Sequence, residues 1–247
     1  MKRYIIRITI LLTAAATIAG CNGASRKAKA EEALKQAQAD SIAAAEKLSL
    51  EQKQQQQKEK EVMPTIESLP EEPVFDIVTN MGTIKVKLYR KTPRHRLNFE
   101  KLALSGYYDS LLFHRVINGF IIQGGDPNTL DTLRETYGMG GPAYTIPAEI
   151  KEGMEAGYRH KKGALAAARK GDAANPMKES SGSQFYIVQD AANCSHLDGE
   201  YTVFGETVAG MAVIDKIARV KTDRRDMPLN DVRIITIKPD KSDQNDN

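Results

Sequence analysis

Residues 113–126 read FHRVINGFIIQGGD, and the interpretation of the whole sequence starts from this stretch. Two largely apolar runs, Phe113–Ile117 and Phe120–Gln123, flank the dipeptide Asn118-Gly119. Asn-Gly readily adopts the positive φ angles of a tight turn between antiparallel strands. The stretch therefore predicts a β-hairpin that carries arginine and glutamine side chains among apolar ones.

Short alternating runs continue on both sides of this hairpin and predict one mainly-β domain over residues 73–240. One helix is expected to start at Thr92-Pro93, with Thr92 as its cap, and to end at Gly106. A second is expected over Met211–Ala218. Many short strands with two helices are typical of an antiparallel barrel or a sandwich, and the pattern alone does not choose. The further strands expected are Val74–Thr79, Thr83–Tyr89, Ala143–Ile146, Gly163–Ala168, Gln184–Val188, Thr202–Phe204 and Val232–Ile237.

Composition and charge exclude several classes of protein. The two cysteines lie far apart, so neither a disulfide framework nor a CxxC site is expected. The four histidines show no metal-ligand spacing, and the chain has neither a phosphate-binding loop nor a GxSxG motif. The formal charge of +3 comes from three basic residues among the first twenty, and the remainder is formally neutral. We therefore expect no nucleic-acid partner.

The first twenty residues have the basic start and apolar run, Ile8–Ile18, of a secretory signal. The run is too short for a membrane-spanning helix, which needs about 20 residues. It leads to Cys21 in a sequence that resembles the lipobox of bacterial lipoproteins, in which the cysteine is acylated. The alternative is an ordinary signal peptide followed by a chance cysteine. By analogy with lipoprotein sorting, Asn22 favours an anchor in the outer membrane of the cell envelope, facing the periplasm.

Residues 21–72 predict the lipidated Cys21 followed by a tether. Between residues 26 and 61 the chain is rich in Ala, Glu, Lys and Gln and has no Gly or Pro. These residues favour a helix but are too polar for a core. A solvated spacer is the main interpretation; a coiled coil is the alternative, because Leu34 and Leu48 lie two heptads apart. At the other end, residues 241–247 form a polar tail.

The sequence FHRVINGFIIQGGD resembles the signature of the cyclophilins, which are peptidyl-prolyl cis/trans isomerases. Four further family segments follow in the same order: GGPAYTIPAE at 140–149, GALAAARKG at 163–171, SGSQFYIV at 181–188 and HLDGEYTVFGET at 196–207. The resemblance implies a closed eight-stranded antiparallel β-barrel capped by two helices, with the substrate groove on its outer surface. It also implies a chain that binds proline-containing polypeptides. Because rotation about an X-Pro bond breaks no bond, no cofactor or metal is expected.

The resemblance assigns a role to each matching residue. Arg115 matches the donor to the prolyl nitrogen, and Gln123 matches the amide that holds the substrate backbone beside it. The apolar cup for the proline ring corresponds to Phe120, Ile121, Tyr186 and Leu197. Ala168 and Arg169 match the edge that pairs with the substrate backbone, and Gln184 lies beside this edge. His114 is expected to be structural, with its imidazole bonded to backbone.

The sequence departs from the family pattern at several positions of the substrate site. Tyr186 stands where many members have Phe, so its hydroxyl needs a partner. Ala167 replaces a larger Met, and Tyr201 replaces a groove His. His196 replaces the Trp that contributes to cyclosporin binding, which predicts weak cyclosporin binding here. Residues 128–137 are an insertion that we expect to form a surface loop, and the remaining thiol, Cys194, is expected to be inert.

Three hypotheses follow for the function. The first is an isomerase that assists the folding of exported proteins. The second is a proline-peptide binding module or chaperone with little turnover, which the substitutions at Ala167, Tyr186 and Tyr201 favour. The third is a structural envelope lipoprotein in which the tether matters most.

Overall fold

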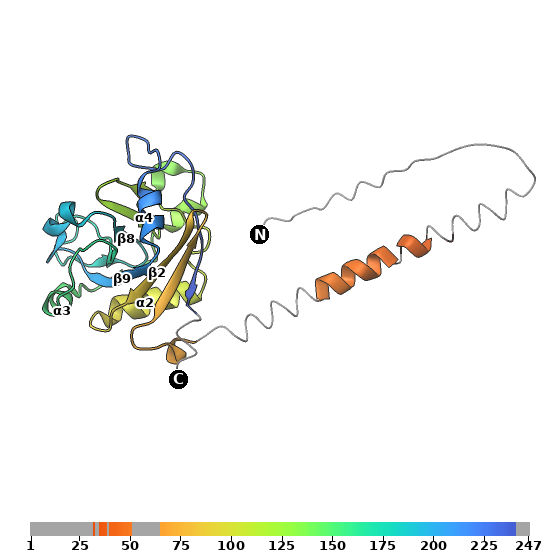
Figure 1. Ribbon diagram of the computed structural model, residues 1–247, viewed down its shortest axis with the longest axis horizontal. Helices are drawn as coiled ribbons and strands as arrows, with labels where there is room; N and C mark the ends of the chain where they lie inside the picture. Colours follow the sequence, from red (N-terminus) through yellow and green to blue (C-terminus); the bar gives the residue numbers. More distant parts are fainter. Residues whose placement is uncertain (1–31, 33–34, 39, 51–64, 241–247) are drawn as a thin grey trace, which may run out of the picture. The chain divides into compact units, whose positions relative to one another are not determined.

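The computed structural model describes residues 32, 35–38, 40–50 and 65–240. The expected signal peptide, Cys21 and the polar tail lie outside these residues. The chain divides into two units, Met1–Val62 and Met63–Asn247. In the first unit the described residues form an exposed α-helix (Figure 1), as its composition favours. No helix among the described residues has the length and apolar content needed to cross a membrane.

The second unit is built on an antiparallel sheet of eight strands (Figure 1). The strand order across the sheet is β10-β1-β2-β9-β6-β8-β4-β3, and β5 and β7 pair separately. The predicted hairpins are both present: β1 pairs with β2, and β3 with β4. The strands are β1 (Val74–Thr79), β2 (Gly82–Leu88), β3 (Arg115–Val116), β4 (Ile121–Gly124), β5 (Thr145–Ile146), β6 (Ala164–Ala167), β7 (Ser180–Ser181), β8 (Phe185–Val188), β9 (Val203–Ala209) and β10 (Ile234–Pro239).

The expectation of a closed barrel was wrong, because the sheet curls without closing. Its edge strands β3 and β10 share no ladder. Instead, the segments that precede them meet at one isolated bridge, between Leu112 and Arg233. The Phe113 N–H donates to the Val232 carbonyl at 2.9 Å, and Ile234 N–H donates to the Leu111 carbonyl at 2.8 Å. The two edges therefore touch through irregular chain, and a half-barrel results.

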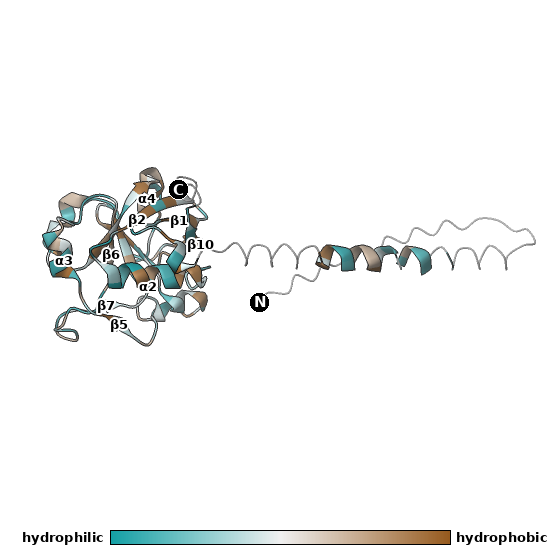
Figure 2. Ribbon diagram, turned by 90° about the horizontal axis from the view of Figure 1, so that it is seen from below, coloured by the Kyte–Doolittle hydropathy of each residue, from teal (hydrophilic) through white to brown (hydrophobic). Residues whose placement is uncertain are grey.

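Three α-helices lie beside this sheet: α2 (Pro93–Leu104), α3 (Ile150–Glu155) and α4 (Met211–Ala218). Helices α2 and α4 match the two that the sequence predicts, and the short α3 was not expected. Helix α2 shows both hydrophilic and hydrophobic residues in Figure 2 and turns Phe99 and Ala103 into the core. Such a two-sided pattern is what a helix packed on a sheet requires.

The prediction that the Thr92 side chain caps helix α2 was wrong. The Thr92 side chain makes no capping hydrogen bond. The free N–H groups of Arg94 and His95 donate instead to the Glu149 carboxylate, at 2.9 and 3.0 Å. His95 Nδ1 also lies 2.6 Å from Glu149, and its Nε2 lies 2.8 Å from the Ser180 hydroxyl. Because these side chains are buried, the Ser–His–Glu arrangement serves the packing of the helix.

Alternate residues of the central strands point to opposite faces of the sheet, as the pleat requires. In β8, Phe185 and Ile187 enter the main core with residues of helix α2. Tyr186 and Val188 face the other way, into a second apolar cluster that contains Leu197. This second cluster defines the face of the sheet on which the predicted site lies.

Candidate active site

Four neighbouring strands place the predicted site residues in one row. Arg115 on β3 is opposite Gln123 on β4, and Gln123 is opposite Tyr186 on β8. Tyr186 in turn is opposite Ala166 on β6. Directly paired residues point to the same face of a sheet. The register therefore brings the predicted donor, the predicted amide and the aromatic residue to a single surface.

Arg115 begins a relay of amide hydrogen bonds. Its Nη1 donates to Gln123 Oε1 at 3.3 Å, and Gln123 Nε2 donates to Gln184 Oε1 at 3.0 Å. Gln184 Nε2 then donates to the carbonyls of Gly138 and Gly140, at 3.0 and 2.8 Å. Each amide is thereby held in one orientation, with the Gln123 oxygen toward the guanidinium. Gln184 is only 6% exposed, so its side chain supports Gln123 from behind.

The relay ends on a loop that Asp126 organises. This buried carboxylate accepts the N–H groups of Asn128 at 2.8 Å, of Gly138, and of Gly140 at 3.2 Å. At Gly140 a Cβ would lie 2.1 Å from Asp126 Oδ1, so only glycine fits there. Asp126 is the last residue of the sequence FHRVINGFIIQGGD. Its role depends on contacts with residues up to fourteen positions away, which local sequence patterns do not reveal.

The insertion at residues 128–137 is a surface loop, as expected, in which Thr129 is the one buried residue. It contains two short 3₁₀ turns, η2 (Pro127–Leu130) and η3 (Arg134–Thr136). Arg134 Nη2 donates to the Pro228 carbonyl at 2.7 Å, which fastens the loop to a distant segment. The loop is therefore held at both ends, by Asp126 and by Arg134.

Apolar side chains gather beside the polar row. Ile121, Tyr186 and Leu197 belong to the second apolar cluster, and the half-buried Phe120 packs against it. The exposed His196 ring stacks on Phe120, with centroids 6.1 Å apart and planes 10° from parallel. The structure thus brings together the four residues that the resemblance assigns to the proline ring.

The hydroxyl of Tyr186 has a buried partner that the sequence did not indicate. It lies 2.9 Å from Nε2 of His160, whose Nδ1 lies 2.7 Å from Asp198 Oδ1. Tyr186 is 3% exposed, and burial raises the pKa of its phenol well above the ordinary value. The polar tip of this ring is therefore satisfied inside the protein and is held as a neutral phenol.

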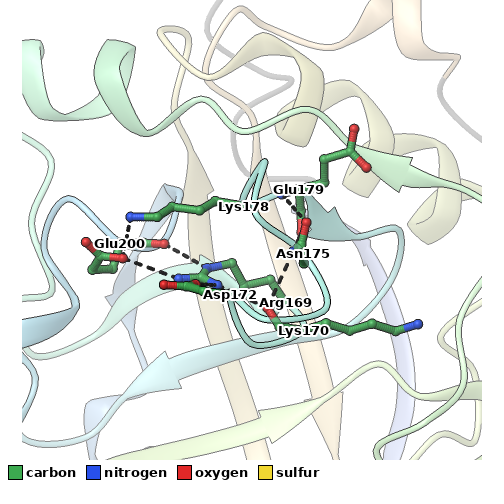
Figure 3. A network of polar contacts seen from close by, with 7 residues as sticks. All are labelled: Arg169, Lys170, Asp172, Asn175, Lys178, Glu179 and Glu200. Carbon is green, nitrogen blue, oxygen red and sulfur yellow. Dashed lines mark hydrogen bonds and ion pairs between the residues drawn. The ribbon is translucent and has the colours of Figure 1, made fainter.

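The charge of Arg169 is paired within a network of polar contacts that includes Asp172 and Glu200 (Figure 3). Its buried guanidinium donates to the Glu200 carbonyl at 2.9 Å and to Asp172 at 2.5 Å, and lies 4.5 Å from the centre of the Tyr201 ring. Within residues 65–240, no hydrogen bond engages its backbone N–H or C=O. Those groups remain available to pair with an extended peptide. By contrast, Ala168 donates its N–H to Gln184 and accepts from Ser181.

Tyr201 completes this side of the site. Its ring meets Tyr186 edge to face, with centroids 6.0 Å apart, while Arg169 covers it. Ala167, in contrast, lies on the opposite face of the sheet, in the main core. Its small size therefore affects the packing around Phe185 and not the surface that carries Arg115.

His114 and Cys194 are two further buried residues whose pKa values are shifted by burial. His114 is buried, as a structural role requires, and its imidazole interacts with the Leu112 backbone, although neither ring nitrogen forms a hydrogen bond of good geometry. Burial lowers the pKa of His114, although the charge of Asp126 and the Leu112 backbone act in the opposite direction. Burial also raises the pKa of the Cys194 thiol to about 11, which keeps it protonated and unreactive.

Among the described residues, no cluster of three His, Cys, Asp or Glu side chains could hold a metal ion.

Comparison with known proteins identifies the domain that carries this site. The model of the family described as cyclophilin type peptidyl-prolyl cis-trans isomerase/CLD matches residues 74–239. The chain belongs to the cyclophilin family. It is thus a cyclophilin-type peptidyl-prolyl cis-trans isomerase, and the row from Arg115 to Tyr186 lies inside the matched region.

Individual cyclophilins resemble the chain over the same region. Peptidyl-prolyl cis-trans isomerase CYP18-2 of Arabidopsis thaliana is 36% identical, over 67% of this chain and 93% of the relative. An isomerase-like 2 protein of Rhizopus delemar is 39% identical, over 64% of this chain, which spans only 27% of that longer protein. The crystal structure of a cyclophilin type isomerase from Cryptosporidium parvum superposes with a TM-score of 0.60 at 30% identity, covering 69% of this chain and 98% of that one. A second crystal structure of that isomerase was obtained in the presence of the dipeptide Ala-Pro (TM-score 0.59, 29% identity, 68% and 99% covered).

Proposed function

We propose that Arg115 is the catalytic donor of this isomerase. The supporting observation is that its guanidinium has Gln123 as its one hydrogen-bond partner among the described residues, and that Gln123 in turn pairs with Tyr186 of the second apolar cluster. Twisting an X-Pro amide breaks its resonance, and the pyramidal prolyl nitrogen then accepts a hydrogen bond. A fixed donor at that nitrogen stabilises the twisted state more than either planar state. The free N–H groups of Arg115 can supply that bond.

The required acceleration fits such a mechanism. Uncatalysed exchange takes tens of seconds over a barrier of about 18–20 kcal/mol. Exchange in about a millisecond needs roughly five decades, or about 7 kcal/mol. The charged Arg115 donor supplies part of this reduction in the barrier, and the hydrogen bond from Arg115 to Gln123 holds its guanidinium in one orientation. The remainder comes from holding the substrate, with the proline ring against Phe120 and the peptide backbone along Arg169.

Turnover distinguishes this proposal from a proline-peptide binding module. The substitution at Tyr186 favoured the binding module, but its hydroxyl has found a buried partner in His160 and so gives no reason to expect weak catalysis. We expect a chain that begins at Asn22 to accelerate the cis-to-trans exchange of a chromogenic X-Pro peptide at low temperature. Measurable peptide affinity without any acceleration would instead support the binding module.

We further propose that the domain acts on exported proteins in a bacterial envelope, where the lipidated Cys21 anchors it and the helix-prone segment spaces it from the membrane. The proposal is supported by the basic-then-apolar start that leads to Cys21. Labelling of the full chain with a radioactive fatty acid tests it, with Cys21→Ser as the matched control. Label that persists in Cys21→Ser, or recovery of the unaltered chain without lipid, would contradict the anchor. Deletion of residues 26–61 then tests whether the tether contributes to the envelope phenotype.

A further inference from the structure

Tyr186 is part of a hydrogen-bonded series of three polar side chains, of which Tyr186 and His160 are buried and Asp198 is partly exposed. The Tyr186 hydroxyl lies 2.9 Å from His160 Nε2, and His160 Nδ1 lies 2.7 Å from Asp198 Oδ1. The same carboxylate oxygen also accepts the His160 backbone N–H at 2.8 Å. His160 is 3% exposed.

The contacts determine which atom donates and which accepts in each hydrogen bond between Tyr186, His160 and Asp198. Because Asp198 accepts at Nδ1, the neutral imidazole carries its hydrogen there and presents a lone pair at Nε2. The Tyr186 O–H must then donate to Nε2. Burial lowers the pKa of His160, while its hydrogen bond to Asp198 acts in the opposite direction. The imidazole therefore stays neutral near pH 7 and keeps accepting the hydroxyl proton.

We propose that His160 is a positioning residue for the isomerase: by accepting the Tyr186 hydroxyl, it keeps the polar tip of that ring away from the proline ring and holds the ring within the apolar cluster that contains Ile121 and Leu197. This inference rests on the assignment of the active site above. Without His160, a buried hydroxyl would have no partner, and such a group recruits water or moves to reach it. In both cases a polar group, either the water or the displaced hydroxyl, lies against the apolar surface that must bind the proline ring.

The ring positions agree with this role. The His160 and Tyr186 rings lie nearly parallel, 13° apart, with centroids 6.0 Å from each other. Tyr201 also contacts Tyr186, edge to face, with the ring centroids 6.0 Å apart. Tyr186 is therefore confined by packing on one side and by a hydrogen bond at its tip. If the hydrogen bond to His160 is lost, packing still holds the ring, and only the hydroxyl end of Tyr186 is free to move.

The test is a pair of substitutions whose effects should not add. We expect His160→Phe, in a chain that begins at Asn22, to lower kcat/KM by about tenfold, mainly through a higher KM, because the hydroxyl disturbs proline binding. Tyr186→Phe, which removes the hydroxyl itself, is the background for the comparison, and the effect of His160→Phe is measured again in that background. The kcat/KM of the double variant should lie within about threefold of that of Tyr186→Phe, because no buried hydroxyl is left without a partner. If the double variant retains the full loss of His160→Phe, the role of His160 is structural and the proposal is overturned.

A second variant keeps the test decisive if His160→Phe does not fold. In His160→Gln the side-chain oxygen can still accept the Tyr186 hydroxyl, so we expect a smaller loss than for any His160 variant without an acceptor. Equal losses in His160→Gln and His160→Leu at equal folded fraction would overturn the proposal. These outcomes are separate from failure of the isomerase assignment, which would appear as no turnover by the unaltered chain.

Discussion

The amide relay predicts that Gln184 supports catalysis without contacting the reacting bond. The perturbation is Gln184→Leu, which keeps the approximate volume and removes the amide. Three hydrogen bonds disappear: one to Gln123 and two to the carbonyls of Gly138 and Gly140. At a net value of about 1 kcal/mol each, and with exposed Gly138 able to bind water instead, the expected loss of stability is about 2–3 kcal/mol.

Two assays measure this effect. Because the chain has no Trp, far-UV circular dichroism is the suitable probe of unfolding. For a domain of this size the loss corresponds to a fall of about 5–10 °C in Tm. Below that temperature, kcat/KM should fall about tenfold, because the freed Gln123 no longer orients Arg115. A Gln184→Leu variant with unchanged Tm and unchanged kcat/KM would refute the relay.

Three other predictions follow from buried or altered groups. Burial lowers the pKa of His114 in the folded chain below its ordinary value of about 6.5, so the unfolded chain takes up the proton first and the free energy of unfolding should fall as the pH drops below about 6.5. His114→Phe should flatten this slope in urea titrations, and an unchanged slope would contradict the prediction. Glu149→Gln should lower the unfolding free energy by about 2 kcal/mol in urea titrations. The reason is that the single oxygen of the amide cannot accept all three N–H groups that the Glu149 carboxylate accepts. Equal stability of the variant and the unaltered chain would contradict the capping role. Cyclosporin should inhibit weakly because His196 stands where many cyclophilins have Trp, and His196→Trp should tighten inhibition in the peptide assay; tight inhibition of the unaltered chain would be the contrary result.

Much of the local structure could be predicted because short patterns encode it. Strand Val74–Thr79 and helix Met211–Ala218 appear with the predicted bounds. The Asn118-Gly119 turn joins β3 and β4, with Gly119 at a φ of 78°. Alternation of apolar residues fixes a strand, and a turn residue with positive φ fixes a hairpin.

What could not be predicted depends on contacts between distant parts of the chain. Glu149 caps a helix that begins 56 residues earlier, so Thr92 seemed the obvious cap from local sequence alone. His160 reaches Tyr186 from 26 residues away, and no short motif links them. Closure of a sheet likewise depends on the register at its two edges. The resemblance supplied the site residues that sheet pairing then brings together, such as Arg115 and Gln123.

The most direct test of the central claim compares Arg115→Ala and Arg115→Lys with the unaltered chain from Asn22 onward. Circular dichroism first establishes equal folding, since the half-buried Arg115 side chain donates one hydrogen bond, to Gln123. Exchange of the chromogenic X-Pro peptide is then measured at low temperature. Removal of one fixed donor should lower kcat/KM by about 10²–10³ in Arg115→Ala, and by less in Arg115→Lys, which keeps the charge but loses the planar fork. Acceleration by Arg115→Ala equal to that of the unaltered chain would contradict the assignment of Arg115 as the catalytic donor.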